Sequence, residues 1–169
     1  PTFNQTLQER GAKTHYMYAD ITKDGVPQQI IETCIEEFGS VDILVNCAGI
    51  CPVDDVISYG RDKWDATINI NLTAAFDMSH EAAKVMIPQK SGKIINICSL
   101  FSFLGGQWAP AYAASKHGLA GLTKAYCDEL AQYNIQVNGI APGYFKTAVA
   151  QASIEDTERN KWIVDHTPE

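Results

Sequence analysis

The sequence has no long apolar run, and basic residues are in the minority. Its longest apolar stretches have the length of β-strands and fall short of the roughly 18 residues that a membrane-spanning helix needs. Thirteen Lys and Arg residues stand against 20 Asp and Glu residues, so the net charge is -7. A chain of this charge is not expected to bind the phosphate backbone of nucleic acids. We therefore expect neither a membrane nor a nucleic acid as a partner.

Cysteine is also scarce, and its five occurrences show no regular spacing. An odd number of scattered cysteines argues against a disulfide framework and favours reduced thiols in a cytoplasmic protein. Cys47 and Cys51 are four residues apart, but a zinc site needs two further ligands that we cannot place in the sequence. We therefore expect no metal site.

Segments with strand and helix character alternate along the 169 residues. Strands are predicted at 14–19, 41–45, 93–98 and 135–140, and helices at 26–38, from about 61 to 90, and at 111–133. Gly11 and Gly39 are predicted to follow helix ends. Strands joined by helices of this length form right-handed βαβ units and a parallel sheet. The sequence therefore predicts an α/β protein with a doubly wound, Rossmann-like parallel sheet in a single domain over residues 1–169. Helices should cover both faces of that sheet, and functional residues should follow the strands.

Tyr112 and Lys116 are the leading candidates for acid–base chemistry. They are four residues apart on a predicted helix, so the ammonium group can lie beside the phenol. A nearby positive charge lowers the pKa of a phenol, which suits proton exchange with an alcohol or ketone. The same spacing occurs at Tyr59 and Lys63, where no serine at a strand end precedes it. Tyr59 is therefore expected to be a residue of a solvated helix start.

Other residues in chain order strengthen the choice of Tyr112. Ser99 ends a predicted strand thirteen residues earlier, and this spacing favours it over its neighbour Ser102. The segment Asn46-Cys47-Ala48-Gly49 ends the preceding strand, Asn71 lies in a helical stretch, and Pro142-Gly143-Tyr144-Phe145-Lys146-Thr147 ends the following strand. In this order and at these spacings, the set resembles the short-chain dehydrogenase/reductase family from about Gly11 onward.

The resemblance implies an oxidoreductase that uses NAD or NADP as its cofactor. Tyr112 would be the general acid/base, and Lys116 would lower its pKa and hold the nicotinamide ribose. Ser99 would orient the substrate carbonyl, and Asn71 would hold a water that links Lys116 to solvent. The residues that the resemblance assigns to cofactor binding are Asp20, Ile21, Asn46, Ala48, Gly49, Tyr112, Lys116, Pro142, Gly143, Phe145 and Thr147.

Structural interpretations of three of these residues remain open. Asn71 could cap or kink a helix, Gly49 could serve only a turn, and Asp20 could be the N-terminal cap of the next helix.

Two departures from the family pattern affect the cofactor. Cys47 replaces the family's second Asn, a small change that we expect to be tolerated. No Gly-x-x-x-Gly-x-Gly turn follows any predicted strand, and the family's first two strands and its final strand are missing. In the sheet of the family, the first two strands lie between the strand at 14–19 and the strand at 41–45. Their loss would leave buried backbone groups unpaired in the middle of the sheet. We therefore expect the 169 residues to be part of a longer polypeptide.

The substrate is expected to be a sugar acid. The run from Asn134 to Thr147 and the loop from Phe101 to Gly106 are most similar to gluconate 5-dehydrogenases and 2-deoxygluconate 3-dehydrogenases. Gln107, Trp108 and Tyr144 are candidates for the substrate pocket by position. Alternatives are the same chemistry on another secondary alcohol or a 3-oxoacyl thioester, a catalytically silent binding scaffold, and a methyltransferase. Family members are commonly homotetramers or homodimers that pack their two long helices together, here near 61–90 and 111–133.

Overall fold

The computed structural model describes residues 3–145 and 157–165, and its centre is a three-stranded parallel sheet in the order β1-β2-β3. The strands are β1 (Ile43–Asn46), β2 (Gly92–Ile97) and β3 (Ile135–Ile140). The α-helices are α1 (Phe3–Glu9), α2 (Val26–Phe38), α3 (Arg61–Ile68), α4 (Ala74–Gln89), α5 (Pro110–Leu130) and α7 (Thr157–Asp165). A π-helix, η1 (Asn69–Thr73), joins α3 to α4, and short 3-10 turns η2 (Leu100–Ser102) and η3 (Ala131–Tyr133) flank α5.

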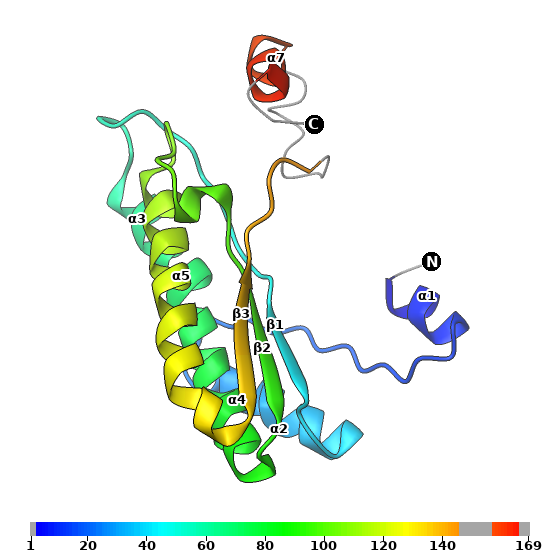
Figure 1. Cartoon of the computed structure of the whole chain (residues 1–169). Helices are drawn as coiled ribbons and strands as arrows, with labels where there is room; N and C mark the ends of the chain where they lie inside the picture. The colour runs from blue at the N-terminus through cyan, green and yellow to red at the C-terminus, as the bar shows by residue number, and fades with distance from the viewer. Residues whose placement is uncertain (1–2, 146–156, 166–169) are drawn as a thin grey trace.

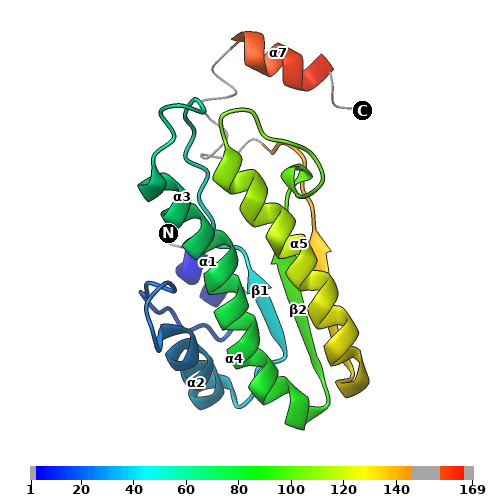
Figure 2. The same cartoon turned by 90° about the vertical axis from the view of Figure 1, so that its left-hand side faces the viewer.

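The connections between strands are the βαβ crossovers that the sequence predicts. Helices α3 and α4 lead from β1 to β2, and α5 leads from β2 to β3. Asn46 pairs in register with Asn96, and Ile97 pairs with Ile140, so the three strands end at one edge of the sheet. Helices α2, α4 and α5 lie together on one face of the sheet (Figures 1 and 2). The predicted α/β fold with a parallel sheet is confirmed.

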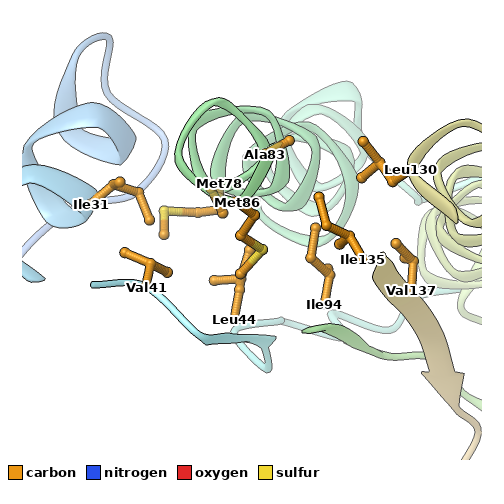
Figure 3. Packing of buried hydrophobic residues seen from close by; sticks show 11 residues of the cluster. Ile31, Val41, Leu44, Met78, Ala83, Met86, Ile94, Leu130, Ile135 and Val137 are labelled. Carbon is orange, nitrogen blue, oxygen red and sulfur yellow. The ribbon is translucent and has the colours of Figure 1, made fainter. Parts of the chain in front are cut away.

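The hydrophobic core lies between this helical layer and the sheet. Ile94 of β2 and Met86 of α4 are completely buried, and Ile135 of β3 is 1% exposed. Ile31 of α2 and Leu130 of α5 close the two sides of the cluster (Figure 3). Alternating burial along β2 follows from the two-residue period of a strand, which sends every second side chain toward the helices. The core therefore fixes α4 and α5 over the strands that end at the site.

The opposite face of the sheet is open in the part of the chain that the structure describes. Ile43 and Val45 of β1 are 59% and 50% exposed, and Ile140 of β3 is 52% exposed. The sequence predicts helices on both faces, because the run Val41–Val45, which overlaps β1, is mostly apolar. Among residues 3–145 and 157–165, helices cover one face only, so this part of the prediction is not met here.

The segment predicted as a strand at Thr14–Ala19 has no strand structure, so that prediction is wrong. Tyr16 and Tyr18 are 72% and 93% exposed. A strand is stable only when a neighbouring strand takes up its backbone hydrogen bonds, and no described strand lies beside this segment. It is instead attached to the end of α2, where Lys13 donates to the backbone carbonyl of Glu37 and lies 5.0 Å from the centre of the Phe38 ring.

The helix ends follow the predicted glycines. Gly39 caps α2 with φ of 88° and donates its N–H to the carbonyl of Ile35 at 2.8 Å. Gly11 follows α1 with φ of 81°. Both angles lie in the left-handed region, which glycine adopts without steric cost. None of the helices in the described ranges is long and apolar enough to cross a membrane.

Candidate active site

Four side chains from three elements meet at the carboxyl ends of β1 and β2. Tyr112 and Lys116 lie in the first two turns of α5, Ser99 follows β2, and Asn71 lies in η1. Pro110 begins α5, and its fixed φ suits the first turn of a helix. The Nζ atom of Lys116 lies 5.5 Å from the centre of the Tyr112 ring, as the i, i+4 spacing predicts.

Lys116 is almost fully enclosed, with 5% of its surface exposed. Its Nζ atom donates a hydrogen bond to the backbone carbonyl of Ile97 at 2.6 Å. Ile97 is the last residue of β2, so this bond fixes the lysine to the strand that precedes Ser99. Burial lowers the pKa of Lys116 because the charged form loses hydration.

The electrostatic environment of Tyr112 differs from the sequence prediction. Burial raises the pKa of the Tyr112 phenol, and a hydrogen bond with the Ser99 hydroxyl partly opposes this by favouring the phenolate. Lys116 was predicted to lower this pKa, but burial has the larger effect. The ammonium group of Lys116 is bonded to Ile97 and does not hydrogen-bond the phenol oxygen. The predicted direction of the pKa shift is therefore wrong for the chain alone.

Ser99 is the N-terminal cap of the 3-10 turn η2, which fixes its hydroxyl group. The Oγ atom of Ser99 accepts a hydrogen bond from the N–H of Phe101 at 3.2 Å. This leaves the hydroxyl proton of Ser99 available for the hydrogen bond with Tyr112. Phe101 also meets Tyr112 directly, with ring centres 5.9 Å apart in an edge-to-face arrangement. The turn thus places a hydroxyl and an aromatic wall beside the phenol.

Asn71 is 1% exposed and hydrogen-bonded on both ends of its carboxamide. Its Oδ1 atom accepts from the N–H of Ile50 at 2.8 Å, and Nδ2 donates to the carbonyl of Ile50 at 2.9 Å and to Ser115 Oγ at 3.1 Å. A Cβ atom on Gly49 would lie 3.2 Å from Asn71 Oδ1 and 3.9 Å from Lys116 Nζ. Gly49 therefore lets the backbone approach both side chains, beyond any role in a turn. Asn71 lies inside the π-helix η1, a helical irregularity that is frequent at functional sites.

Tyr59 and Lys63, the second Tyr–Lys pair with this spacing, make contacts that stabilise a loop. Lys63 Nζ forms an ion pair with Asp54 at 2.6 Å, and the Tyr59 hydroxyl donates to the carbonyl of Pro52 at 3.3 Å. Both groups therefore hold the loop before α3. This supports the choice of Tyr112 over Tyr59.

A small cavity of about 130 Å³ lies beside the end of β1. It is lined mainly by apolar side chains, and three of its residues are the predicted cofactor contacts Ile21, Asn46 and Ala48.

Asp20 is exposed nearby, and its Oδ1 atom accepts hydrogen bonds from the backbone N–H and the hydroxyl of Thr22 at 3.1 Å and 2.7 Å. These two bonds lower the pKa of Asp20. The interpretation of Asp20 as the cap of the next helix is wrong, because Gly25 caps α2.

The predicted contacts after β3 are described only in part. Pro142, Gly143 and Phe145 lie in the loop beyond the strand, and Phe145 is 67% exposed. A Cβ atom on Gly143 would lie 4.0 Å from a methyl group of Leu100, so this loop approaches the turn that follows Ser99. Thr147 lies outside the described residues. Of the pocket candidates, Trp108 and Tyr144 are 48% and 44% exposed.

Sequence reasoning missed the residues that support the site. Ser115 lies inside the Tyr-x-x-x-Lys segment, and its Oγ atom donates to the carbonyl of Tyr112 at 2.8 Å and accepts from Asn71. Its position directly before Lys116, within the Tyr-x-x-x-Lys segment, was the sequence feature that could have identified it. The backbone groups of Ile50 and Ile97 carry no sequence signal, because any residue can provide them.

The cysteines form no disulfide among the described residues, which include all five. Cys98 is buried behind Ser99, and Cys47 is exposed beside the cavity. No group of three or more potential ligands that could hold a metal ion occurs within residues 3–145 and 157–165.

Comparisons with known proteins agree with the geometry. The family model for short chain dehydrogenases matches residues 2–158. An uncharacterized oxidoreductase of Escherichia coli K12, YgcW, is 60% identical over 97% of this chain and 63% of its own length. The 2-dehydro-3-deoxy-D-gluconate 5-dehydrogenase of the same organism is 43% identical over 89% of this chain and 60% of its own length. This chain therefore spans less than two thirds of either relative.

A crystal structure of a gluconate 5-dehydrogenase from Burkholderia cenocepacia, in complex with NADP and tartrate, has a similar fold. It superposes with a TM-score of 0.94 at 34% identity, over 99% of this chain and 66% of the other.

Proposed function

The chain belongs to the short-chain dehydrogenase family, and on that premise we propose that it is the catalytic part of an NAD- or NADP-dependent oxidoreductase. The reaction is hydride transfer between the cofactor and a hydroxyl or keto carbon, and the substrate is a sugar acid of the gluconate type. Tyr112, Lys116, Ser99 and Asn71 are the catalytic residues of this proposal.

The observation that carries the proposal is the convergence of Ser99, Tyr112 and Lys116. A hydroxyl, a phenol and an ammonium group meet at the carboxyl edge of a parallel sheet. Lys116 Nζ lies 5.5 Å from the centre of the Tyr112 ring, and the Ser99 hydroxyl acts to lower the pKa of the phenol. This edge is where open α/β sheets bind their ligands. A binding scaffold without catalysis has no chemical need for this set of groups.

The residues of this chain fit the two ends of a dinucleotide cofactor. Ile21 and Ala48 line an apolar cavity beside β1, which suits an adenine ring. Gly49 leaves the backbone open beside Asn71 and Lys116, as close approach of a ribose requires. Lys116, with Phe145 and Thr147 beyond β3, would hold the nicotinamide end. A glycine-rich turn for the pyrophosphate is not present in the 169 residues.

The chain's own residues provide the proton chemistry. When bound, the cofactor supplies or accepts the hydride. Tyr112 donates a proton to the substrate oxygen during reduction and removes it during oxidation, because a phenol can reach both protonation states at a fixed position. Without substrate the Ser99 hydroxyl directs its one proton at the phenol, and with substrate bound it donates that proton to the substrate oxygen instead. Lys116 stabilises the phenolate once it forms.

A sugar acid is the substrate that the relatives support best. The E. coli relative and the B. cenocepacia structure are both named as 5-dehydrogenases of gluconate-type acids. Phe101 packs against Tyr112, and Phe103 and Trp108 of the same loop are 66% and 48% exposed, so this loop offers aromatic rings to the apolar face of a sugar chain. Another secondary alcohol or a 3-oxoacyl thioester is the second candidate substrate.

The test is a screen of the full-length protein for reduction of NAD and NADP with gluconate-type acids, and for the reverse reaction with their keto forms. We expect turnover with at least one sugar acid and one of the two cofactors. Turnover only with simple secondary alcohols or thioesters would reject the substrate, and no turnover with any of them would reject the catalytic function.

We also propose a homotetramer or homodimer formed through α4 and α5. Phe76 of α4 is 43% exposed, stacks on His80 with ring centres 5.8 Å apart and lies 6.4 Å from the ring of Tyr126 on α5. This aromatic group on the outer surface suits contact with a second copy. Phe76→Asp is expected to lower the mass measured by light scattering, and an unchanged mass would reject this interface.

A cytoplasmic location is the final element of the proposal. It rests on the five cysteines, whose number and positions suit reduced thiols. Fractionation of cells that express the full-length protein tests it, and recovery outside the cytoplasm would reject it.

A further inference from the structure

Ser102 lies between the backbones of two proposed catalytic residues. It is the last residue of the 3-10 turn η2, and 4% of its surface is exposed. Its Oγ atom donates a hydrogen bond to the backbone carbonyl of Lys116 at 2.9 Å. The same atom accepts a hydrogen bond from the backbone N–H of Ser99 at 3.2 Å. One hydroxyl group therefore joins the turn that carries Ser99 to the helix that carries Lys116.

We propose that Ser102 is a positioning residue that fixes the Ser99 hydroxyl relative to Tyr112 and Lys116, an inference that rests on the function proposed above. Ser102 does not contact the substrate or the cofactor in this proposal. It acts through the backbones of Ser99 and Lys116, and its removal changes the placement of Ser99.

The geometry of the turn explains how one hydroxyl can do this. The backbone N–H of Ser102 donates to the carbonyl of Ser99 at 2.9 Å, which closes the turn. The Ser102 hydroxyl returns to the N–H of Ser99, so Ser99 is held at both its carbonyl and its N–H. The N–H of Phe101 then meets Ser99 Oγ at 3.2 Å and directs the Ser99 proton away from the turn.

The second bond of Ser102 sets the position of the whole turn. The turn η2 follows β2, and the catalytic phenol and ammonium group lie on α5, so the two parts must be held in register. The hydrogen bond from Ser102 to Lys116 crosses between them at the residue that itself anchors β2 through Ile97. Ser99, Ser102 and Lys116 thus form a closed set of contacts around the end of β2.

Sequence reasoning treated Ser102 as a rival of Ser99 for one catalytic role. The structure assigns different roles to the two hydroxyls. The Ser99 hydroxyl is partly exposed, accepts only the N–H of Phe101 from the backbone and acts on the phenol of Tyr112. Ser102 Oγ is buried and uses both its donor and an acceptor position on the backbone.

The test compares Ser102→Ala with wild type in the full-length protein, using the sugar acid and cofactor on which the wild type turns over. Loss of the bridging hydroxyl is expected to lower kcat about tenfold and to leave the KM for the cofactor within about twofold, because small displacements of a catalytic group are costly. Thr67→Val is the matched control. Thr67 is fully buried and also donates to a backbone carbonyl, that of Lys63 at 2.7 Å, but it does not bond to Ser99 or Lys116.

A second readout reports on Tyr112 without turnover. In protein with ¹³Cζ-labelled tyrosine, the resonance that is missing from the spectrum of Tyr112→Phe is assigned to Tyr112. The chemical shift of this resonance as a function of pH gives the titration midpoint of Tyr112. Because the hydrogen bond from Ser99 lowers the pKa of Tyr112, Ser102→Ala should raise this midpoint and Thr67→Val should not. If Ser102→Ala does not fold, Ser102→Cys keeps a similar shape with a weaker donor and should raise the midpoint by less.

The outcomes separate this inference from the proposed function. A wild type without turnover would reject the function, while the titration would still decide the role of Ser102. An unchanged kcat and an unchanged Tyr112 midpoint in folded Ser102→Ala would overturn the positioning role. An equal fall in kcat in Thr67→Val would also overturn it, because the effect would then be a general loss of packing.

Discussion

The carboxamide of Asn46 is hydrogen-bonded to the carboxamide of Asn96, with Asn46 Nδ2 lying 2.8 Å from Asn96 Oδ1. These residues are register partners at the ends of β1 and β2. Asn96 Nδ2 in turn donates to Thr123 Oγ1 on α5 at 2.9 Å. A chain of polar contacts thus runs beneath the site, from the strand end that carries the predicted cofactor contacts to the helix that carries Tyr112.

Substitution of Asn96 tests this chain of contacts. Asn96 is 1% exposed, so Asn96→Ala would remove two buried hydrogen bonds, one with the Asn46 amide and one with the Thr123 hydroxyl. The Asn46 amide would keep its bond to Ser79, and the Thr123 hydroxyl would keep its bond to the carbonyl of Leu119. We expect the free energy of unfolding to fall by about 2–3 kcal/mol, measured by urea denaturation. Gln132→Ala, at an exposed glutamine near the end of α5, should change it by less than about 0.5 kcal/mol. Equal effects of the two substitutions would contradict the role of the buried amides.

Gly49 offers a test of the close approach beside Asn71. Gly49→Ala would bring a Cβ atom to 3.2 Å from Asn71 Oδ1, which already accepts the N–H of Ile50. Asn71 would have to move, and its bonds to Ile50 and Ser115 would lengthen. We expect kcat of the full-length enzyme to fall at least about tenfold, measured by steady-state kinetics. Wild-type kcat together with wild-type cofactor affinity would show that this approach has no role.

The titration of Tyr112 should be shifted upward in the cofactor-free protein. Burial raises its pKa above the ordinary value of 10.0, and the hydrogen bond from Ser99 opposes this rise. Ser99→Ala should therefore raise the midpoint further, as read from the ¹³Cζ resonance of Tyr112. A midpoint below the ordinary value would mean that the charge of Lys116 outweighs burial.

The same shift makes stability depend on pH. The folded protein binds the Tyr112 proton more tightly than the unfolded chain does. The contribution to stability is therefore complete below the unfolded pKa and is lost as the pH rises through the folded pKa. Tyr112→Phe should reduce this alkaline loss, measured by thermal unfolding at increasing pH.

The sequence was informative where structure depends on local pattern. The helix at 26–38 and the strand at 135–140 were predicted with the bounds that the structure has, because apolar periodicity and flanking glycines are local signals. The strand predicted at Thr14–Ala19 failed because strand formation depends on partners elsewhere in the chain. The π-helix at Asn69–Thr73 was not predicted, since it accompanies contacts of Asn71 with a residue 21 positions away.

In the site too, some residues could be predicted from the sequence, and others depend on tertiary contacts. Tyr112, Lys116, Ser99 and Asn71 could be selected from spacing and order, and the structure brings them together. The role of Ser102 could not be selected, because it depends on the fold of a turn against α5. The direction of the Tyr112 pKa shift was also mispredicted. Spacing reveals a neighbouring charge but does not reveal how deeply a phenol is buried.

The most direct test of the proposed chemistry is hydride transfer by Tyr112→Phe in the full-length protein, with Tyr59→Phe as control. Single-turnover reduction of the cofactor by a gluconate-type acid should slow by at least about 100-fold in Tyr112→Phe, because the proton acceptor is lost. Cofactor affinity should stay close to that of the wild type. Tyr59→Phe should slow the reaction by less than about threefold, since it loses one neutral hydrogen bond to Pro52. A rate near that of the wild type in Tyr112→Phe would contradict Tyr112 as the general acid/base.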